Sequence, residues 1–594
     1  MELASVKGSV LDAFEVALIE TLKPYMEKVE YSAGDTIFRA GEPSDSFYIL
    51  ESGEVAVEMR DEELDTESVL DYLGPGSFLG EVSVLARTPR EVNAVAREDV
   101  VAQQVSAAGL RRLFDEAPRD GIDALRALAR NAALQLEQAS AQVSQSLADS
   151  APDFEVEEMV RKARAAQAEF ESWDEERVDA LLGDIAETVS GKAQELGEKT
   201  MEETHLGRLE DKIAKIGFAS MAVYQSLEGK PAAGEIGRDD ENKIVELASP
   251  VGVVVALVPV TNPVETIVNK VLISLKGRNA IIISSHRMAQ VVGDMACTLI
   301  REVIEKHGAP ADLIQWFVKR TSRRKTSKLM RHEGIGMILA TGGQSMVRAA
   351  YSSGKPAIGV GAGNAPAWIA PDADLDKAAM AVVVSKGFDY GLICGSEQHL
   401  VVDRSIRDDF SAALERQGAV VLDKEGTEKF MAGAFEPTGD LKMLLVGQSA
   451  ARIAEACGLE VPEDAKLLVF EADASNPEGA QAHERLAPVL SFFTVDGDDE
   501  AVELCGKLLD YHGAGHTSNV HTQDQGRIDR FAAAMPTGRV LVNSPSSLGC
   551  AGVSTGLPPS LTLGCGTYGG NSTTDNVSYR NLLNIKRVAR ALDG

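Results

Sequence analysis

The sequence is poor in cysteine, and its cysteines are not arranged in pairs. Its 594 residues include six cysteines, scattered from Cys297 to Cys565, and none of them forms a CxxC pair. This scarcity argues against a disulfide framework and against a cysteine-based zinc site, so we expect no metal ion. It is typical of a reducing cytoplasm, where each cysteine is either a buried packing residue or a reactive thiol.

Long apolar runs and excess basic charge are also lacking. No run approaches the roughly 18–20 residues that cross a bilayer, and the N-terminus lacks the basic start and apolar core of a secretion signal. The sequence has 59 lysines and arginines against 90 aspartates and glutamates, a formal net charge of -31. This balance argues against nucleic-acid and membrane partners, although one arginine or a helix N-terminus can still hold a small anion. We therefore expect a cytoplasmic protein that binds small molecules.

The pattern that is present predicts several domains. The length corresponds to about three or four folding units, and 44% hydrophobic with 25% charged residues is typical of a packed protein. Residues 30–110 show short alternating stretches separated by glycines, which is typical of an all-β sandwich or roll. Residues 106–148 have helical spacing, and the small, polar stretch 140–152 marks a boundary.

The rest of the chain has the pattern of an α/β protein. Residues 155–228 are rich in Ala, Glu, Lys and Leu and predict long helices. Short apolar runs then alternate with helical segments, for example the run 280–283 followed by the helix 288–307. Such alternation predicts parallel strands with crossover helices, as in a doubly wound sheet.

Two segments of the N-terminal part carry a recognisable motif. They are Gly34–Gly53, and Phe78–Leu85 with the following Thr88-Pro89-Arg90. Together they resemble the cyclic-nucleotide-binding β-roll. The resemblance implies that Arg90 pairs with the cyclic phosphate and Glu81 accepts from the ribose, which suits a guanidinium fork. Glu91 departs from the family pattern. A carboxylate there repels the anion or competes for Arg90. The alternative is that the roll is a packing or assembly module that binds no nucleotide.

A reactive thiol is predicted in the segment Phe388–Gln398. Cys394 lies there between residues that include Gly391 and Gly395, and Ser396 follows. The glycines permit a tight turn and close approach of a substrate. A thiol at the junction of a loop and a helix N-terminus is favoured as thiolate, so Cys394 is the candidate nucleophile.

Further segments occur in a characteristic order with this one: Val260–Pro263, Leu275–His286, Ala340–Gly343, Gly359–Asn364, Gly515–Ser518, Asn543–Ser547 and Pro559–Gly566. In this order they resemble the CoA-acylating aldehyde dehydrogenases, and most of all the aldehyde dehydrogenase half of the bifunctional aldehyde–alcohol dehydrogenases.

The resemblance implies a multidomain chain: a cyclic-nucleotide-binding-like all-β roll and an α/β aldehyde dehydrogenase fold with a Rossmann-like cofactor domain and an α/β catalytic domain. The predicted boundaries are 1–118 for the roll, 119–152 for a helical connector, 153–385 for the NAD(P)-binding region, and 386–594 for the catalytic region with an oligomerisation segment.

The resemblance also implies a mechanism that chemistry supports. Cys394 attacks an aldehyde, the Asn262 amide and the Cys394 backbone N–H stabilise the oxyanion, and hydride transfer leaves a thioester on Cys394. Hydrolytic relatives place a glutamate base in the glycine loop, but residues 356–366 contain no carboxylate. The acyl acceptor is therefore predicted to be coenzyme A, with His516 moving the proton of its thiol.

Cofactor contacts come from the same resemblance. The residues implied are Ser284, Ser285 and His286 at the adenosine ribose, Thr341, Gly342 and Gly343 near the pyrophosphate, and Glu484 at the nicotinamide ribose. The cofactor is NAD or NADP, because no acidic residue marks the ribose site and Arg287 is nearby. NAD is slightly favoured.

The predicted substrate is a short-chain aldehyde such as acetaldehyde, and the predicted assembly is a homo-oligomer. Sulfoacetaldehyde, succinate semialdehyde and propionaldehyde are the competing substrates. A hydrolytic dehydrogenase and a catalytically silent sensor or assembly protein are the competing functions. Cys565, which also has flanking glycines, is the rival nucleophile. A cyclic nucleotide is the candidate effector.

Overall fold

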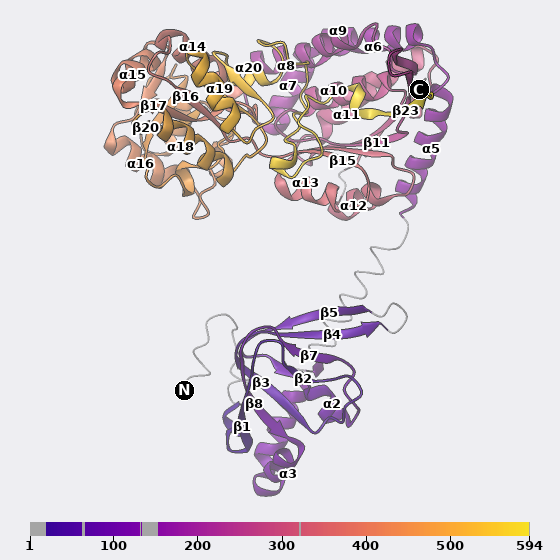
Figure 1. Ribbon diagram of the computed structural model, residues 1–594, viewed down its shortest axis with the longest axis vertical. Coiled ribbons are helices and arrows are strands. Elements are labelled where there is room, and N and C mark those ends of the chain that lie inside the picture. The colour runs from indigo at the N-terminus through magenta and orange to yellow at the C-terminus, as the bar shows by residue number, and fades with distance from the viewer. Residues whose placement is uncertain (1–18, 62–65, 131, 134–152, 320–321, 593–594) are drawn as a thin grey trace. The chain divides into compact units, whose positions relative to one another are not determined.

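The computed structural model describes residues 19–61, 66–130, 132–133, 153–319 and 322–592 (Figure 1). The chain divides into two compact units, Met1–Ala151 and Pro152–Gly594. Among the described helices, none combines the length and the apolarity that crossing a membrane requires.

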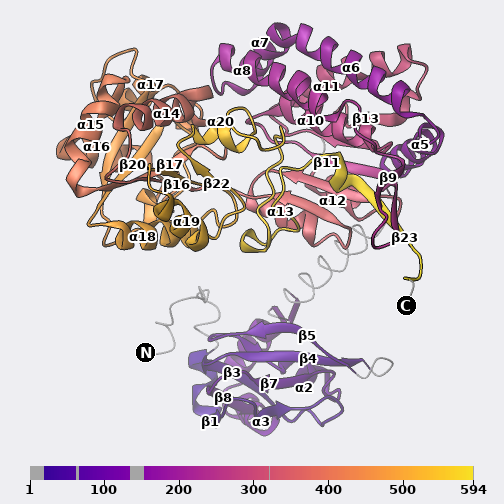
Figure 2. The same cartoon turned by 45° about the horizontal axis from the view of Figure 1, so that its top comes forward.

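The first unit contains two four-stranded antiparallel sheets, visible in Figure 2. One sheet has the strand order β1 (Met26–Tyr31), β8 (Val100–Ser106), β3 (Ser46–Ser52), β6 (Phe78–Leu79). The other has the order β2 (Thr36–Phe38), β7 (Asn93–Ala96), β4 (Val55–Asp61), β5 (Thr66–Leu73). On β3, Phe47 and Ile49 enter one hydrophobic cluster and Tyr48 and Leu50 enter the other, as alternation along a strand requires. The predicted all-β roll is confirmed.

Helices flank the roll. The short helix α2 (Glu81–Ala86) begins after Gly80, whose φ is 82°, and α3 (Ala107–Glu116) is capped by the Ser106 side chain. Residues 118–130 are helical. The remainder of the predicted connector, 134–152, lies outside the described residues.

The second unit begins with the predicted helices. They are α5 (Phe154–Phe170), α6 (Glu175–Gly191), α7 (Ala193–Thr204), α8 (Leu209–Gly217) and α9 (Val223–Leu227). Their apolar residues pack against a five-stranded parallel sheet in one continuous core. That sheet has the strand order β13 (Ile314–Trp316), β12 (Ala280–Ser284), β11 (Val253–Leu257), β14 (Met337–Thr341), β15 (Ala357–Val360). The crossover helices are α10 (Pro263–Lys276), α11 (Gln290–Lys306), α12 (Arg323–Arg331) and α13 (Gln344–Tyr351).

A seven-stranded parallel sheet follows. Its strand order is β18 (Ala419–Val421), β19 (Leu467–Ala472), β20 (Val489–Val495), β17 (Glu397–Asp403), β16 (Ala365–Ile369), β21 (Ser518–His521), β22 (Val540–Val542). Its helices are α14 (Leu375–Gly387), α15 (Arg407–Arg416), α16 (Lys424–Ala434), α17 (Ala450–Ala456), α18 (Asp498–Tyr511), α19 (Gln525–Ala534) and α20 (Ser546–Cys550). Strand β16 of this sheet precedes residue 386, the predicted start of the catalytic region.

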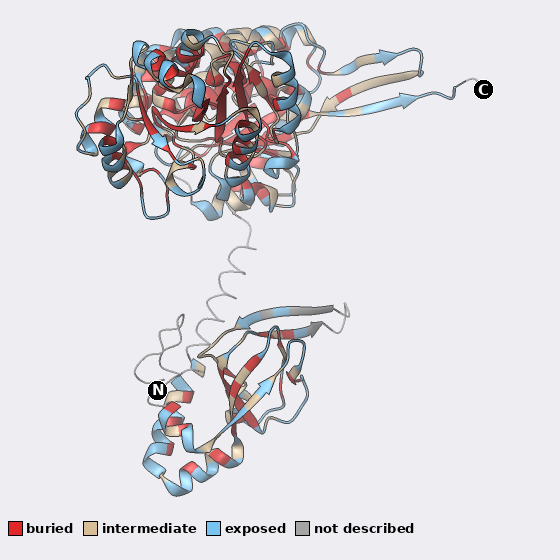
Figure 3. Ribbon diagram, turned by 60° about the vertical axis from the view of Figure 1, so that its left-hand side comes forward, coloured by how far each residue is buried: buried red, intermediate tan, exposed pale blue. Residues whose placement is uncertain are grey.

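A third sheet of the second unit pairs a strand near the end of the chain with an earlier hairpin. Strand β23 (Leu583–Ala589) lies antiparallel to β10 (Ile244–Pro250), which pairs with β9 (Gly234–Asp239). Figure 3 shows this ribbon extending from the body of the second unit, with β9 and β23 mostly exposed and β10 mostly of intermediate burial, while both parallel sheets are buried.

At the loop that joins the two parallel sheets, the carboxyl ends of strands in the five-stranded sheet face the amino ends of strands in the seven-stranded sheet. Gly359–Asn364 leaves the carboxyl end of β15 and enters the amino end of β16. The Cys394 segment precedes β17, and the His516 segment precedes β21. Loops at strand ends carry sites in such folds, and here loops of both sheets meet.

Candidate active site

The pair Cys394 and His516 lies at the meeting point of the two sheets. The Nε2 atom of His516 is 3.2 Å from the Sγ atom of Cys394, although 122 residues separate them in the sequence. The Nδ1 atom of His516 contacts the Thr517 hydroxyl at 2.9 Å, and Arg539 donates to the His516 carbonyl at 2.9 Å. With Nδ1 protonated, Nε2 is the acceptor that faces the thiol.

The protonation states of this pair follow from burial. Burial raises the pKa of the Cys394 thiol, and the nearby Cys550 and Glu484 raise it further. Burial lowers the pKa of His516 to about 3, with a smaller contribution from Arg539. The resting pair is thus a neutral thiol beside a neutral imidazole, and the imidazole can accept the proton when the sulfur attacks a carbon.

We expect the pH dependence of kcat/KM to reflect the neutral His516 imidazole beside the neutral Cys394 thiol. In the wild type, the low pKa of His516 keeps the imidazole neutral above about pH 4, so it contributes no acidic limb to kcat/KM in the neutral range. In His516→Gln the base is lost, and the rate should fall about 100-fold at neutral pH. Because the remaining thiolate fraction rises about tenfold per pH unit below the thiol pKa, the variant's rate should rise with pH, as rates of cofactor reduction can measure.

A matched control is His307→Gln, since His307 pairs with Asp184 among the helices of the second unit. It should keep the wild-type rate and profile. A flat pH profile for His516→Gln with an unchanged rate contradicts the role of His516.

The glycine loop packs directly on the nucleophile. A Cβ atom on Gly363 would overlap the Cys394 carbonyl, and one on Gly395 would overlap the Cys550 sulfur. The Gly363 N–H donates to Glu484 Oε1 at 2.8 Å. Burial raises the pKa of Glu484 to about 7, although this hydrogen bond opposes the shift. The loop itself has no carboxylate, but the fold supplies one from residue 484.

Asn262 caps α10 from the carboxyl side of β11. Its Oδ1 accepts from the Lys215 ammonium, and its Nδ2 lies 3.1 Å from the Thr261 hydroxyl. An ammonium group has only donors, so the contact with Lys215 fixes which end of the amide is oxygen. One N–H of the Asn262 amide is left to donate to a ligand.

The predicted cofactor residues lie along the carboxyl edge of the five-stranded sheet, except for Glu484. Ser284 ends β12 and is 3.4 Å from the Thr326 hydroxyl of α12, while His286 accepts from Met288 in the following turn. Thr341 ends β14 and carries a buried hydroxyl without a hydrogen-bond partner. Gly343 caps α13, where an added Cβ would meet nothing within 4 Å. An unpaired hydroxyl beside an unobstructed helix N-terminus fits a pyrophosphate.

A cavity of about 440 Å³ lies beside the glycine loop. It is lined by Gly361 and Ala362, by Gln344 and Arg348 of α13, and by Cys565, among others. Buried polar atoms of His512 and Asn571, both in its lining, lack partners. The cavity therefore offers hydrogen-bonding groups to a polar ligand close to the nucleophile loop.

The other cysteines have different surroundings. The Cys565 sulfur faces the Leu563 carbonyl at 3.6 Å rather than an imidazole. Cys297 and Cys505 are fully buried in the hydrophobic cores, and Cys457 packs against one. Cys550 is buried with Leu541 and Leu563, and Cys394 packs against this cluster. Proximity of Cys550 to the nucleophile was not expected from the sequence, since no spacing rule links residues so far apart.

In the roll, both predicted nucleotide contacts are buried. Glu81 opens α2. The Arg90 guanidinium donates to the Gly80 carbonyl at 2.7 Å and to the Ser46 carbonyl, and lies 4.1 Å from the centre of the Phe38 ring. Two nitrogens of the Arg90 guanidinium thus hydrogen-bond to backbone carbonyls of the roll itself.

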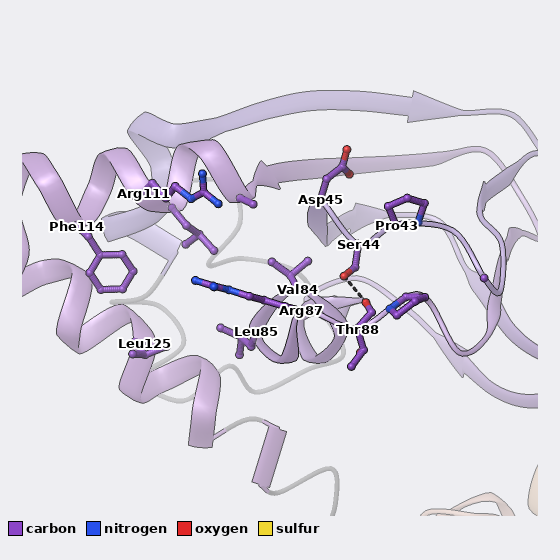
Figure 4. A pocket seen from close by; sticks show the side chains of 14 residues that line it. Pro43, Ser44, Asp45, Val84, Leu85, Arg87, Thr88, Arg111, Phe114 and Leu125 are labelled. Atoms are coloured by element: carbon purple, nitrogen blue, oxygen red, sulfur yellow. Dashed lines mark hydrogen bonds between the residues drawn. The ribbon is translucent and has the colours of Figure 1, made fainter.

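A separate cavity of about 650 Å³ lies between α2 and α3. Its lining includes Arg87, Val84 and Phe114, but neither Arg90 nor Glu81. Figure 4 shows the Arg87 side chain extending from the end of α2 toward α3.

Two sequence families match the chain. The aldehyde dehydrogenase family matches residues 134–459, and the cyclic nucleotide-binding domain matches residues 28–117. The bifunctional aldehyde-alcohol dehydrogenase AdhE of Escherichia coli K12 is 39% identical over 442 residues, which cover 73% of this chain and 49% of that protein. The chain therefore spans about half the length of the curated relatives that it matches first. The acetylating succinate-semialdehyde dehydrogenase of Clostridium kluyveri is 35% identical over 437 residues, covering 73% of this chain and 96% of that protein.

Solved structures resemble the second unit. An acetylating aldehyde dehydrogenase from Geobacillus thermoglucosidasius has a TM-score of 0.72 and 41% identity, covering 74% of this chain and 97% of that one. A propionaldehyde dehydrogenase from Rhodopseudomonas palustris with bound propionyl-CoA has a TM-score of 0.66 and 25% identity, covering 73% of this chain and 94% of that one. An α/β aldehyde dehydrogenase fold is thereby confirmed.

Proposed function

The chain belongs to the aldehyde dehydrogenase family and carries a cyclic nucleotide-binding domain, and we propose from this premise that it is a CoA-acylating aldehyde dehydrogenase. The observation that carries the proposal is the contact between the Cys394 thiol and the neutral His516 imidazole beside the glycine loop. The resemblance to acetylating enzymes and to a structure with bound propionyl-CoA supports it.

The first half of the reaction acylates the enzyme. The Cys394 sulfur attacks the aldehyde carbon while His516 accepts the thiol proton, and the carbonyl oxygen becomes an oxyanion. The Asn262 amide and the Cys394 backbone N–H donate to that oxyanion. A bound nicotinamide dinucleotide would supply an acceptor for the hydride, and Thr341, Gly343 and the Ser284–His286 turn would hold it. An acyl thioester on Cys394 is left.

The second half transfers the acyl group to coenzyme A. After His516 has released its first proton to water, the CoA sulfur attacks the thioester and His516 accepts the proton of the CoA thiol. The Cys394 thiolate leaves when the tetrahedral oxyanion collapses, and it takes this proton back from His516. The same two donors stabilise that oxyanion. The product is acyl-CoA, and the reverse sequence reduces acyl-CoA to aldehyde.

A hydrolytic reaction is the second candidate, because Glu484 brings a carboxyl group of pKa about 7 to the loop that was expected to have none. That group could activate water in place of CoA. The deciding experiment follows NAD(P)H absorbance with a panel of aldehydes, with and without CoA. CoA-dependent formation of NAD(P)H and acyl-CoA supports the acylating reaction, while equal rates and free acid without CoA support hydrolysis.

The substrate we propose is a short, uncharged aldehyde such as acetaldehyde. Cys394 packs against an apolar cluster formed by Leu541, Cys550 and Leu563. Arg539 is a buried cation near this site, and it donates to the backbone carbonyls of His516 and Gly564. A sulfonate or carboxylate needs a cation with free donors. Acetaldehyde and propionaldehyde should therefore exceed succinate semialdehyde and sulfoacetaldehyde in kcat/KM within the same panel, run with NAD and with NADP.

Regulation by the roll is the finer part of the proposal. A cyclic phosphate would displace the Gly80 and Ser46 carbonyls from Arg90 and take its donors. We expect cyclic AMP or cyclic GMP to bind in calorimetry, to change turnover, and to lose binding in Arg90→Leu.

The control for this variant is Arg87→Leu, whose side chain lines the separate cavity. It should retain binding of the cyclic nucleotide. Failure of both nucleotides to bind the wild-type protein contradicts the proposal and favours a packing module.

A further inference from the structure

Four buried charged side chains form a cluster behind Asn262 and the nucleophile loop. Two are lysines of α8, Lys212 and Lys215, and two are acids, Glu265 of α10 and Asp389. Their side chains are 0–3% exposed. At full ionisation the cluster is neutral, so each charge has a counter-charge despite the loss of water.

Asp389 is the centre of the cluster. Its Oδ2 accepts from Lys212 at 2.9 Å and from Lys215, and its Oδ1 accepts from the Arg208 backbone N–H at 2.8 Å. Its own backbone N–H donates to Asp211 at 2.7 Å. These contacts tie the segment before Cys394 to α8.

The backbone at this point is strained. Asp389 has φ 48° and its neighbour Tyr390 has φ 52°. These values lie in the left-handed region, which residues other than glycine adopt infrequently. Such a conformation persists only where the surroundings impose it. The ion pairs of Asp389 are the contacts that impose this turn, which lies shortly before the nucleophile.

Lys215 connects this anchor to the oxyanion donor. Its ammonium contacts Asp389 Oδ2, the Asn262 Oδ1 atom, and Glu265 Oε1 at 3.3 Å. Burial by itself would lower the pKa of Lys215, but Asp389 and Glu265 outweigh it and raise the pKa. The lysine therefore stays a cation, which can only donate to Asn262.

We propose that Lys215, anchored by Asp389, is a positioning residue that holds the Asn262 amide with its oxygen turned inward and its N–H turned toward the oxyanion. The inference rests on the proposed function, because it assigns Asn262 as the oxyanion donor. Lys215 does not touch substrate and acts through Asn262. Without it the amide can flip and present its oxygen to the developing negative charge.

The test uses variants that leave the cluster neutral. Lys215→Met/Glu265→Gln removes the donor to Asn262 together with one acid and leaves the Lys212–Asp389 pair. The matched control is Lys199→Met/Glu202→Gln, which removes a partly exposed ion pair on α7. If the first variant fails to fold, Lys212→Met/Asp389→Asn removes the other ion pair and frees Lys215 from its anchor.

Two probes separate oxyanion stabilisation from the thiol itself. The burst of p-nitrophenolate from p-nitrophenyl acetate needs Cys394 and an oxyanion donor, but neither dinucleotide nor CoA. Alkylation by iodoacetamide needs the thiol and no oxyanion donor. In full-length Lys215→Met/Glu265→Gln we expect the burst rate to fall about 100-fold, with the alkylation rate of Cys394 within about threefold of wild type.

Dependence on Asn262 gives the decisive readout. If Lys215 acts through Asn262, adding Lys215→Met/Glu265→Gln to Asn262→Ala should cost no further activity. Additive losses, an unchanged burst rate, or a parallel fall in alkylation would each overturn the inference. CoA-dependent turnover of the wild type tests the proposed function separately, since the burst assay requires neither co-substrate.

Discussion

The Cys394→Ser variant should lose CoA-dependent NAD(P)H formation by at least about 10⁴-fold in kcat/KM. Serine is close in size to cysteine, but its hydroxyl is a weaker acid and a poorer nucleophile than a thiol. The acyl-enzyme would also be an ester, a poorer acyl donor to a thiol than a thioester. The measurement is cofactor absorbance with acetaldehyde and CoA, together with mass spectrometry of the acylated peptide.

Cys457→Ser is the matched control. Cys457 packs beside the core of the seven-stranded sheet, and its replacement should leave turnover within about threefold of wild type. The opposite pattern, loss in Cys565→Ser with turnover retained in Cys394→Ser, would transfer the nucleophile to Cys565. An inactive Cys394→Ser that still binds NAD(P) and retains the wild-type Tm excludes misfolding as the cause.

Gly363→Ala should be a severely damaging methyl addition beside the nucleophile. The φ of Gly363 is not positive, so the constraint is space and not backbone conformation: an added Cβ overlaps the carbonyl carbon and oxygen of Cys394. One of the two loops must move, and a shift of about 1 Å at a reacting atom costs about 100-fold in rate. We expect kcat/KM to fall by at least that factor, because Cys394 shifts relative to His516 and the Gly363–Glu484 hydrogen bond is strained.

Gly506→Ala serves as the control for this substitution. Gly506 lies within α18, and an added Cβ there meets nothing within 4 Å. Alanine in a helix is favoured over glycine by roughly 0.5–1 kcal/mol, so the control should keep full activity with an equal or higher Tm. Wild-type kinetics in Gly363→Ala would mean that the loop tolerates displacement and does not hold the nucleophile in place.

Much of the site chemistry was predictable because it is local in the sequence. Cys394 stands beside glycines, and the alternation of apolar runs with helical segments predicts parallel sheets. The helix N-terminus expected beside Cys394 is wrong, because the strand β17 follows it from Glu397, and burial raises the pKa of the thiol instead of favouring the thiolate. Each pattern spans a few residues or one element, so no knowledge of sheet order was needed. The order of the motifs then indicated the family and a nucleophile with its oxyanion donor.

Other features depend on which distant segments meet. The role of Glu484 at the nicotinamide ribose stays a prediction. Its carboxylate accepts from Gly363, 121 residues away, so the glycine loop that has no acid of its own receives one from a distant segment. Lys215 and Asp389 were not predicted at all, because a lysine in a helix with several charged residues looks exposed until the fold buries it. In the roll, Arg90 donates to the carbonyls of Gly80 and Ser46, and the fold decides which carbonyls lie within its reach.

The sequence by itself determined the types of element, their order and the local chemistry of the Cys394 loop, because periodicity and short motifs are properties of neighbouring residues. Only the tertiary structure decided that His516 faces the thiol across 122 residues and that Lys215 turns the amide of Asn262. The physical reason is that strand order and register bring these loops together. Burial then sets the pKa values, lowering that of His516 and raising that of Cys394.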